Sequence, residues 1–83
     1  MTAAEFNKLS LEQRYNLLKK EGDFIGSRLY LNYRIHLFSC EGLFLEMWIV
    51  IGIDQLQWVE VQTNQSILDL YVDKIDLRKI LGF

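Results

Sequence analysis

The chain reads RLYLNYRIHLF over residues 28–38, and this stretch decides the fold. Apolar residues occupy the odd positions and mostly polar residues the even ones, the period of two that a half-buried β-strand shows. The odd set consists of Leu29, Leu31, Tyr33, Ile35 and Leu37. We therefore expect one strand here, with a dry odd face and a wetter even face.

The alternation continues in two further segments. Residues 43–53 keep apolar side chains at every odd position. Residues 56–63 place Val59 and Val61 on the same odd side. Three such strands in succession predict an antiparallel β-meander.

Parity sets the expected register of the two hairpins. For the dry faces to coincide, each hairpin must enclose an odd number of residues, because a slip of one residue inverts every side chain. A loop of residues 40–42 meets this demand, places a glycine in the turn and pairs Ser39 with Leu43. A loop of residues 54–56 also has the required odd number for the next hairpin, although it contains no glycine.

Capping patterns predict helices before the strands. Two capping boxes are present, Thr2 with Glu5 and Ser10 with Gln13. They predict a short helical turn over about residues 3–8 and a helix over about residues 11–21. The second helix has a dry stripe that includes Tyr15 and a wet face that includes Arg14, and Gly22 ends it.

A last helix is expected after the third strand. It begins at Asn64 or Ser66, and Asp76 interrupts it before a final turn. Its apolar stripe consists of Ile67, Leu70, Tyr71 and Ile75. The expected fold is α+β: a three-stranded antiparallel β-meander with the N-terminal and C-terminal helices packed on one face, the odd one. We expect residues 1–83 to form a single domain of this kind.

Composition and charge argue against several classes of function. With 83 residues, the core leaves little chain for the walls of a catalytic cleft. The net charge of -2 gives no attraction toward phosphate backbones, so we expect no nucleic acid partner. The longest apolar run, residues 47–53, is far short of the roughly 20 residues of a membrane span, so no membrane partner is expected. One cysteine and no secretory signal predict a cytoplasmic protein.

The even positions carry more aromatic side chains than a sheet face in contact with water usually does. In the expected register Arg34 lies beside Trp48, and Phe38 lies opposite Phe44. Contiguous surface of this kind commonly marks a binding site. The candidate partner- or ligand-binding residues are Tyr30, Arg34, His36, Phe44, Glu46, Trp48, Gly52 and Trp58.

Gly52 is expected between two aromatic rings. Tyr30 and Trp58 flank it, either as the walls of a slot for a flat apolar ligand or as rings that fold over the glycine backbone. Both arrangements follow from the same register.

Two polar contacts are expected on this face. His36 opposite Glu46 is either an acid–base pair or an ordinary cross-strand ion pair. Arg34 over Trp48 is a cation–π contact. No nucleophile or second carboxylate completes a catalytic set around His36, so we assign no catalytic residue.

No metal or cofactor is expected. Cys40 lies in the predicted hairpin loop without a histidine or cysteine at metal-ligand spacing. Asp69, Asp73 and Asp76 follow one another along the predicted last helix as a cap and a solvated face. No glycine-rich phosphate loop is present in the sequence.

Short motifs spread over nearly the whole chain carry a family resemblance. They comprise Phe6, Asn7 and Leu9, then Gly22, Phe24, Ile25 and Arg28, then Tyr33 with residues 46–49, and Leu68, Asp69 and Tyr71. With these motifs the chain resembles a group of short bacterial proteins that have no assigned activity. The resemblance implies the single-domain fold and no catalytic residue.

Two functions are expected. The first is a small non-enzymatic interaction domain that self-associates as a homodimer, or docks a protein partner, through the even-numbered aromatic face. The alternative is a module that binds a small apolar ligand in the slot of Tyr30, Gly52 and Trp58.

Overall fold

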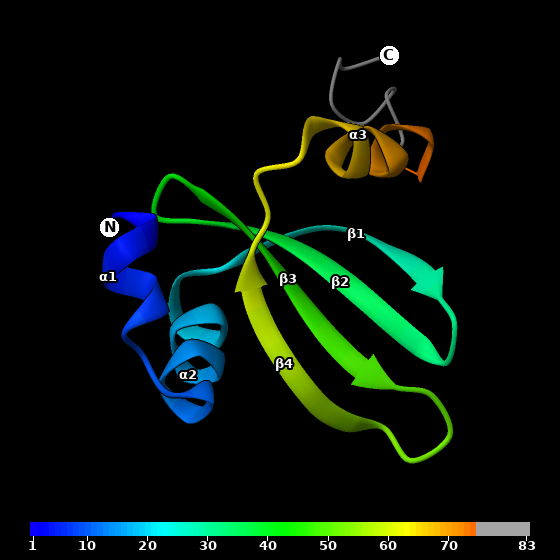
Figure 1. Ribbon diagram of the computed structural model, residues 1–83, viewed down its shortest axis with the longest axis horizontal. Helices are drawn as coiled ribbons and strands as arrows, with labels where there is room; N and C mark the ends of the chain where they lie inside the picture. The colour runs from blue at the N-terminus through cyan, green and yellow to red at the C-terminus, as the bar shows by residue number, and fades with distance from the viewer. Residues whose placement is uncertain (75–83) are drawn as a thin grey trace.

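The computed structural model describes residues 1–74, with side chains through Tyr71. Its elements are α1 (Ala3–Asn7), α2 (Leu11–Glu21), β1 (Asp23–Tyr30), β2 (Tyr33–Cys40), β3 (Leu43–Val50), β4 (Gln55–Val61), α3 (Gln65–Leu68) and the 3-10 helix η1 (Asp69–Lys74). The strands form one antiparallel sheet in the order β1-β2-β3-β4 (Figure 1). The expected α+β meander is confirmed, although it has four strands rather than three.

The N-terminal helices begin where the sequence predicts. Thr2 and Ser10 are their N-caps, and each completes a capping box. The expected faces of α2 are wrong at two neighbouring positions, because Arg14 is buried and Tyr15 is exposed. The physical reason is that backbone carbonyls of α1, of the α1–α2 link and of β4 accept hydrogen bonds from the Arg14 guanidinium.

The predicted first strand is a hairpin. Leu31 and Asn32 form a two-residue turn, so that Tyr30 lies opposite Tyr33. The alternation of apolar and polar residues runs through this turn without a break, and Asn32 is the one typical turn residue in it. A pattern with no interruption therefore predicted one long strand where the chain reverses.

The β2–β3 hairpin turns through two residues, not three. Glu41 and Gly42 both have positive φ, 52° and 80°, as a type I′ turn requires. Cys40 therefore ends β2 inside the sheet, and Cys40 rather than Ser39 lies opposite Leu43. As a result, the odd residues of β2 face the same side as the even residues of β3.

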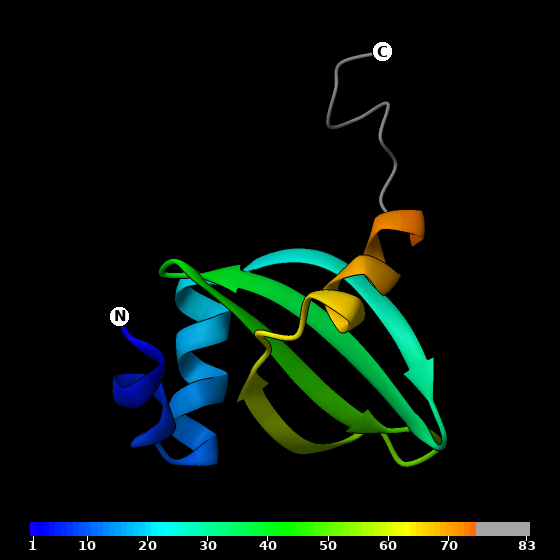
Figure 2. The same cartoon turned by 45° about the horizontal axis from the view of Figure 1, so that its top comes forward.

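The β3–β4 hairpin closes through residues 51–54 instead of 54–56. A bulge follows Trp48, which lies opposite Trp58. From Leu45 to Trp48, odd residues of β3 lie opposite odd residues of β4, so the expected parity is confirmed there. Past the bulge, Ile49 lies opposite Leu56. The two hairpin turns at residues 31–32 and 51–54 lie at the end of the sheet away from α1 and α2 (Figures 1 and 2).

Helices cover both faces of the sheet, and the prediction of one covered face is wrong. Leu45 belongs to a buried cluster with Phe6 and Leu18 of the N-terminal helices. Glu46, the next residue of β3, points to the opposite face, where Tyr71 of η1 contacts it. We call these sides the N-face and the C-face. The odd residues of β2 and the even residues of β3 make the C-face partly apolar, so it also needs a cover.

The main core lies on the N-face. Its buried members are Phe6, Leu18, Cys40, Leu45 and Val59. Fully burying a phenylalanine or leucine contributes roughly 1.5–3 kcal/mol, so this cluster attaches α1 and α2 firmly to β3 and β4. Cys40, expected in a loop, is part of this core, and burial raises the pKa of its thiol.

The C-terminal helical segment crosses the other side. Asn64 is the N-cap of α3 and its side chain accepts from the Ser66 amide at 2.9 Å, which confirms the first of the two expected starts. η1 contacts β1, while α1 and α2 contact β4 (Figure 2). Ile75, Asp76 and the final turn expected after them lie outside the described residues. Of the helices in residues 1–74, none is long and apolar enough to cross a membrane.

Candidate functional site

A fully buried carboxylate lies at the centre of the C-face. Glu46 of β3 has 0% of its surface exposed. Tyr71 Oη donates to its Oε2 at 2.5 Å, Arg28 Nε donates to the same oxygen at 3.0 Å, and Gln62 Nε2 donates to Oε1 at 2.7 Å. Both carboxylate oxygens are therefore satisfied, as a buried charge requires.

The network fixes the protonation of its donors. Burial raises the pKa of the Tyr71 phenol, and its hydrogen bond to Glu46 raises this pKa further, so Tyr71 stays a neutral donor. For Arg28, burial opposes the charged form, but the hydrogen bonds to Glu46 and Tyr71 outweigh burial and raise the pKa. The centre of the C-face is thus a salt bridge supported by a neutral phenol.

Arg28 is anchored through one nitrogen. Its Nε donates to Glu46 and, at 3.2 Å, to Tyr71 Oη. Within the described part of the chain, no group accepts a hydrogen bond from its two terminal nitrogens. The guanidinium carbon lies 5.7 Å from the ring centroid of Trp48 and 5.9 Å from that of Tyr30. The charged guanidinium of Arg28 is therefore held in a fixed direction among aromatic rings.

This guanidinium lines a groove between the sheet and the C-terminal helical segment. The groove has a volume of about 400 Å³, within the roughly 300–1,000 Å³ of small-molecule sites. Its lining residues are Arg28, Tyr30, Trp48, Glu60 and Gln62 from the strands and their ends, and Ile67 and Leu70 from α3 and η1. The strands contribute aromatic rings, a cation and a carboxylate, and the C-terminal helical segment contributes aliphatic side chains.

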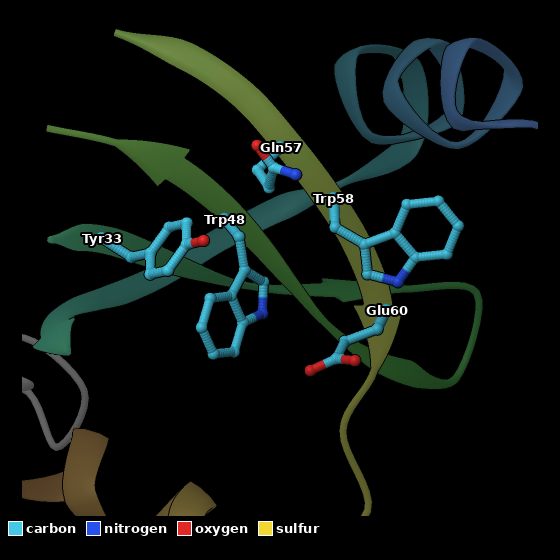
Figure 3. Close-up of a pocket in the computed structure, with 5 residues that line it drawn as sticks. All are labelled: Tyr33, Trp48, Gln57, Trp58 and Glu60. Carbon is cyan, nitrogen blue, oxygen red and sulfur yellow. The ribbon is translucent and has the colours of Figure 1, made fainter. Parts of the chain in front are cut away.

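A second recess continues past Trp48. It measures about 300 Å³ and is lined by Tyr33, Trp48, Gln57, Trp58 and Glu60 (Figure 3). Figure 3 shows the Glu60 carboxylate turned toward the Trp48 indole, whereas the Trp58 ring extends away from it. Tyr30 and Tyr33 meet Trp48 edge to face, with ring centroids 6.1 and 5.3 Å away. Trp48 and Glu60 therefore belong to both recesses.

Trp58 is also attached to the N-terminal helices. The Arg14 guanidinium carbon lies 4.4 Å from the Trp58 ring centroid and 4.9 Å from that of Phe6. The nitrogens of Arg14 donate to the backbone carbonyls of Leu9, Val59 and Asn7 at 3.0, 2.7 and 3.1 Å. Arg14 thus joins α1, α2 and β4, and it holds Trp58 at the edge of the sheet.

The structure brings four of the predicted site residues together. Tyr30, Trp48 and Trp58 line the two recesses, and Glu46 lies beneath them. Phe44 lines a separate recess of about 270 Å³, on the Tyr71 and Leu68 side of the C-terminal segment.

Two predicted polar contacts are wrong. Arg34 and His36 lie on the N-face, opposite Ile49 and Met47, because β2 is shifted by one residue against β3. Arg28 takes the expected place of Arg34 at the Trp48 ring. The nearest polar partner of His36 is Ser27, with Oγ and Nδ1 2.5 Å apart, so His36 forms no pair with Glu46.

The predicted slot at Gly52 is also wrong. Gly52 lies in the β3–β4 turn with φ of 98°, and a side chain built there would meet no atom within 4 Å. Neither Tyr30 nor Trp58 therefore flanks it. The physical reason is the four-residue turn, which removes Gly52 from the strand.

Sequence reasoning missed several residues of the site. They are Arg28, Tyr33, Glu60, Gln62, Ile67, Leu70 and Tyr71. Asn32 was the available signal for Arg28 and Tyr33, because a turn there brings β1 beside β2. Tyr71 meets Glu46 across 25 positions of sequence, and no local pattern indicates such a contact.

Neither the family models nor the curated proteins nor the solved structures contain a match to this chain. The resemblance to a group of short bacterial proteins stays an expectation. Over the described residues, no three histidine, cysteine, aspartate or glutamate side chains converge as metal ligands. A function is therefore inferred from the geometry of the C-face.

Proposed function

We propose that the protein is a non-enzymatic binding domain whose C-face groove takes a ligand with a carboxylate on an apolar body. The observation that carries the proposal is Arg28, held at Nε by Glu46 and Tyr71 while its terminal nitrogens lack a partner among the described residues. The planar fork of an arginine matches a carboxylate with two parallel hydrogen bonds. Trp48 and Tyr30 supply apolar walls beside it.

The buried salt bridge supports a positioning role. A buried ion pair stabilises a fold little, since the cost of removing both charges from water offsets their attraction. An apolar pair of similar size would serve the core as well, but it would not set the direction of a guanidinium. In the proposed function, Glu46 orients the Arg28 guanidinium so that it can bind the carboxylate of the ligand.

A non-catalytic function is favoured by where the polar groups lie. The Ser27–His36 pair lies on the N-face, away from the groove. Of the described residues, Glu60 is the carboxylate that lines the groove. Glu46 is buried next to it with both oxygens hydrogen-bonded. Ser27 and His36 do place a hydroxyl next to an imidazole, with Oγ and Nδ1 2.5 Å apart, but outside the groove. The described residues that line the groove include no serine, threonine, cysteine, lysine or histidine, so no activated nucleophile of these types lies in it.

Fluorescence titration of the single-tryptophan variant Trp58→Phe tests the proposal, because Trp48 is then the only indole. Hydrocinnamate is the probe, and hydrocinnamamide is its uncharged match. We expect the acid to change Trp48 emission saturably and the amide to bind about tenfold or more weakly. Equal binding of acid and amide would overturn the proposal, as would the absence of binding by hydrocinnamate and by every other carboxylate tested. A free peptide C-terminus and its amidated form, compared in the same assay, distinguish a small acid from a peptide as the source.

Two arginine variants in that background give the matched comparison. Arg28→Lys keeps a cation beside Glu46 and removes the fork, so acid affinity should fall about tenfold. Arg34→Lys makes the same change on the N-face and should leave the affinity unaltered. If both variants bind the acid equally well, Arg28 is not the recognition residue.

A second candidate function is self-association through the two hairpin turns. Leu31, Leu29 and Ile53 are 81%, 69% and 66% exposed at that end of the sheet. The Ile51 amide donates to the Asn32 carbonyl at 2.9 Å, so the two turns form one apolar end. Contiguous exposed apolar surface favours a partner, and a second copy needs only one self-complementary patch.

Light scattering at micromolar concentration tests this candidate. The chain of 9.9 kDa should give about twice that mass. A double variant, Leu31→Asn with Ile53→Asn, should return the monomer, whereas Trp48→Tyr in the groove should not. A monomer from the unaltered chain at every concentration rules self-association out.

A further inference from the structure

Glu60 carries a charge that the fold leaves unbalanced. It lies directly opposite Glu46 in the β3–β4 pairing, and like charges in that position repel each other. Arg28 and Tyr71 satisfy Glu46. For Glu60, the described residues provide no salt bridge and no side-chain hydrogen bond. The C-face site therefore holds one cation, Arg28, against two carboxylates.

The surroundings of Glu60 are aromatic. Tyr33, Trp48 and Trp58 line the same recess of about 300 Å³, and the Glu60 carboxylate turns into it (Figure 3). Aromatic faces next to a carboxylate are the combination that holds organic ammonium groups. Trp58 already has the Arg14 guanidinium at 4.4 Å, so one of these rings takes a cation within the fold.

We infer that the ligand of the groove is an organic zwitterion, whose carboxylate meets Arg28 and whose ammonium group lies beside Glu60 in the aromatic recess. The inference rests on the proposed function and adds the cationic group to it. A simple acid would bring a third negative charge to a site that already has two. A zwitterion brings no net charge, and its cation supplies the partner that Glu60 lacks. Because Trp48 lines both recesses, one ligand can lie along its ring and reach both ends.

Matched ligands test the cationic group separately from the carboxylate. The probes are trimethylammonio-carboxylates with methylene spacers of increasing length, each compared with the tert-butyl carboxylate of the same shape. Titration of the full chain by calorimetry should show the best zwitterion binding about tenfold or more tightly than the tert-butyl carboxylate of the same shape, which keeps the anionic group and lacks the cation. The optimal spacer length reports the separation between the two subsites.

Glu60→Gln is the decisive variant, since it keeps the shape of the side chain and removes its charge. It should abolish the preference for the zwitterion, and it should leave the affinity of the tert-butyl acid unchanged or raise it, because one repelling charge is removed. Glu12→Gln, an exposed position on α2, removes the same charge elsewhere and should preserve the preference.

The outcomes separate the two proposals. If the tert-butyl acids bind and the zwitterions bind no better, or if Glu60→Gln keeps the preference, the zwitterion inference is overturned and the acid-binding function stands. If none of these carboxylates binds and hydrocinnamate does not bind either, the proposed function fails.

Discussion

Arg14 and Arg28 show how differently the two faces of the sheet use a cation. Arg14, 5% exposed, donates from each of its nitrogens to backbone carbonyls and lies between Phe6 and Trp58. Arg28, with 11% of its side chain exposed, donates from Nε alone and lines a groove. The first arginine closes the N-face with groups of the chain itself. The second leaves hydrogen-bonding capacity on the C-face, where a ligand can use it.

The largest expected change in stability comes from a substitution in the core of the N-face. Phe6→Ala removes a fully buried ring from the core of the N-face and should lower the free energy of unfolding by about 3–5 kcal/mol. This is a large share of the roughly 4–12 kcal/mol expected for a domain of this size. Leu70→Ala, an exposed position of η1, should change it by less than about 0.5 kcal/mol. Urea unfolding measures both, and similar losses would contradict the assignment of the main core to the N-face.

The next largest change in stability comes from removing Glu46, the acceptor of the hydrogen-bond network on the C-face. Glu46→Ala leaves Arg28, Gln62 and Tyr71 without their acceptor and should cost about 3 kcal/mol in urea unfolding. Glu60→Ala, directly opposite on β4, removes a repelling charge and should be neutral or slightly stabilising. A tolerated Glu46→Ala would mean that the network does not hold Arg28 in place.

A smaller effect of opposite sign is expected at the apolar end. Leu31 has φ of 52°, and a left-handed conformation costs an ordinary residue about 1–2 kcal/mol. Asparagine tolerates this conformation, so Leu31→Asn should raise the free energy of unfolding by about 1 kcal/mol. Leu29→Asn, equally apolar and exposed but inside β1, should give no gain. Thermal unfolding of the two variants decides whether backbone strain or exposure matters at this end.

The smallest expected effect is a pH dependence of stability caused by His36, which lies on the N-face. Burial, together with the Arg34 charge, lowers the pKa of His36 from its ordinary 6.5. The folded state therefore binds a proton less readily than the unfolded state, so stability is complete above about pH 6.5 and falls as the pH drops through the folded pKa. The melting temperature should decrease on acidification, and His36→Gln should reduce that decrease. An unchanged pH profile in the variant would show that His36 is not its source.

Local patterns predicted the elements that local interactions form. Thr2 and Ser10 begin helices independently of the tertiary structure, because each cap forms hydrogen bonds with a residue three positions away. The odd parity of β3 and β4 is correct because Leu45 and Val59 enter one core. The hairpin at Leu31 was not predictable from alternation, because a sheet covered on both faces accepts apolar residues on either side.

The same reason limited the prediction of the site. Trp48, Trp58 and Glu46 follow from the alternation because aromatic and charged residues at even positions of β3 and β4 do lie on one face. Tyr30, at the end of β1, lies on the same face because it is opposite Tyr33 of β2. The sequence favours Arg34 over Arg28 beside Trp48, and this prediction is wrong. A shift of one residue between β2 and β3 moves every side chain of β2, including Arg34, to the other face.

The sequence by itself determined the helix starts, the antiparallel meander and the aromatic character of one side of the sheet, because these follow from spacing along the chain. Tertiary structure alone decided which arginine meets Trp48 and that Glu46 is buried. Those outcomes depend on two-residue turns and on Tyr71 returning to the sheet, and the free energy of such distant contacts is not expressed in any short stretch of residues.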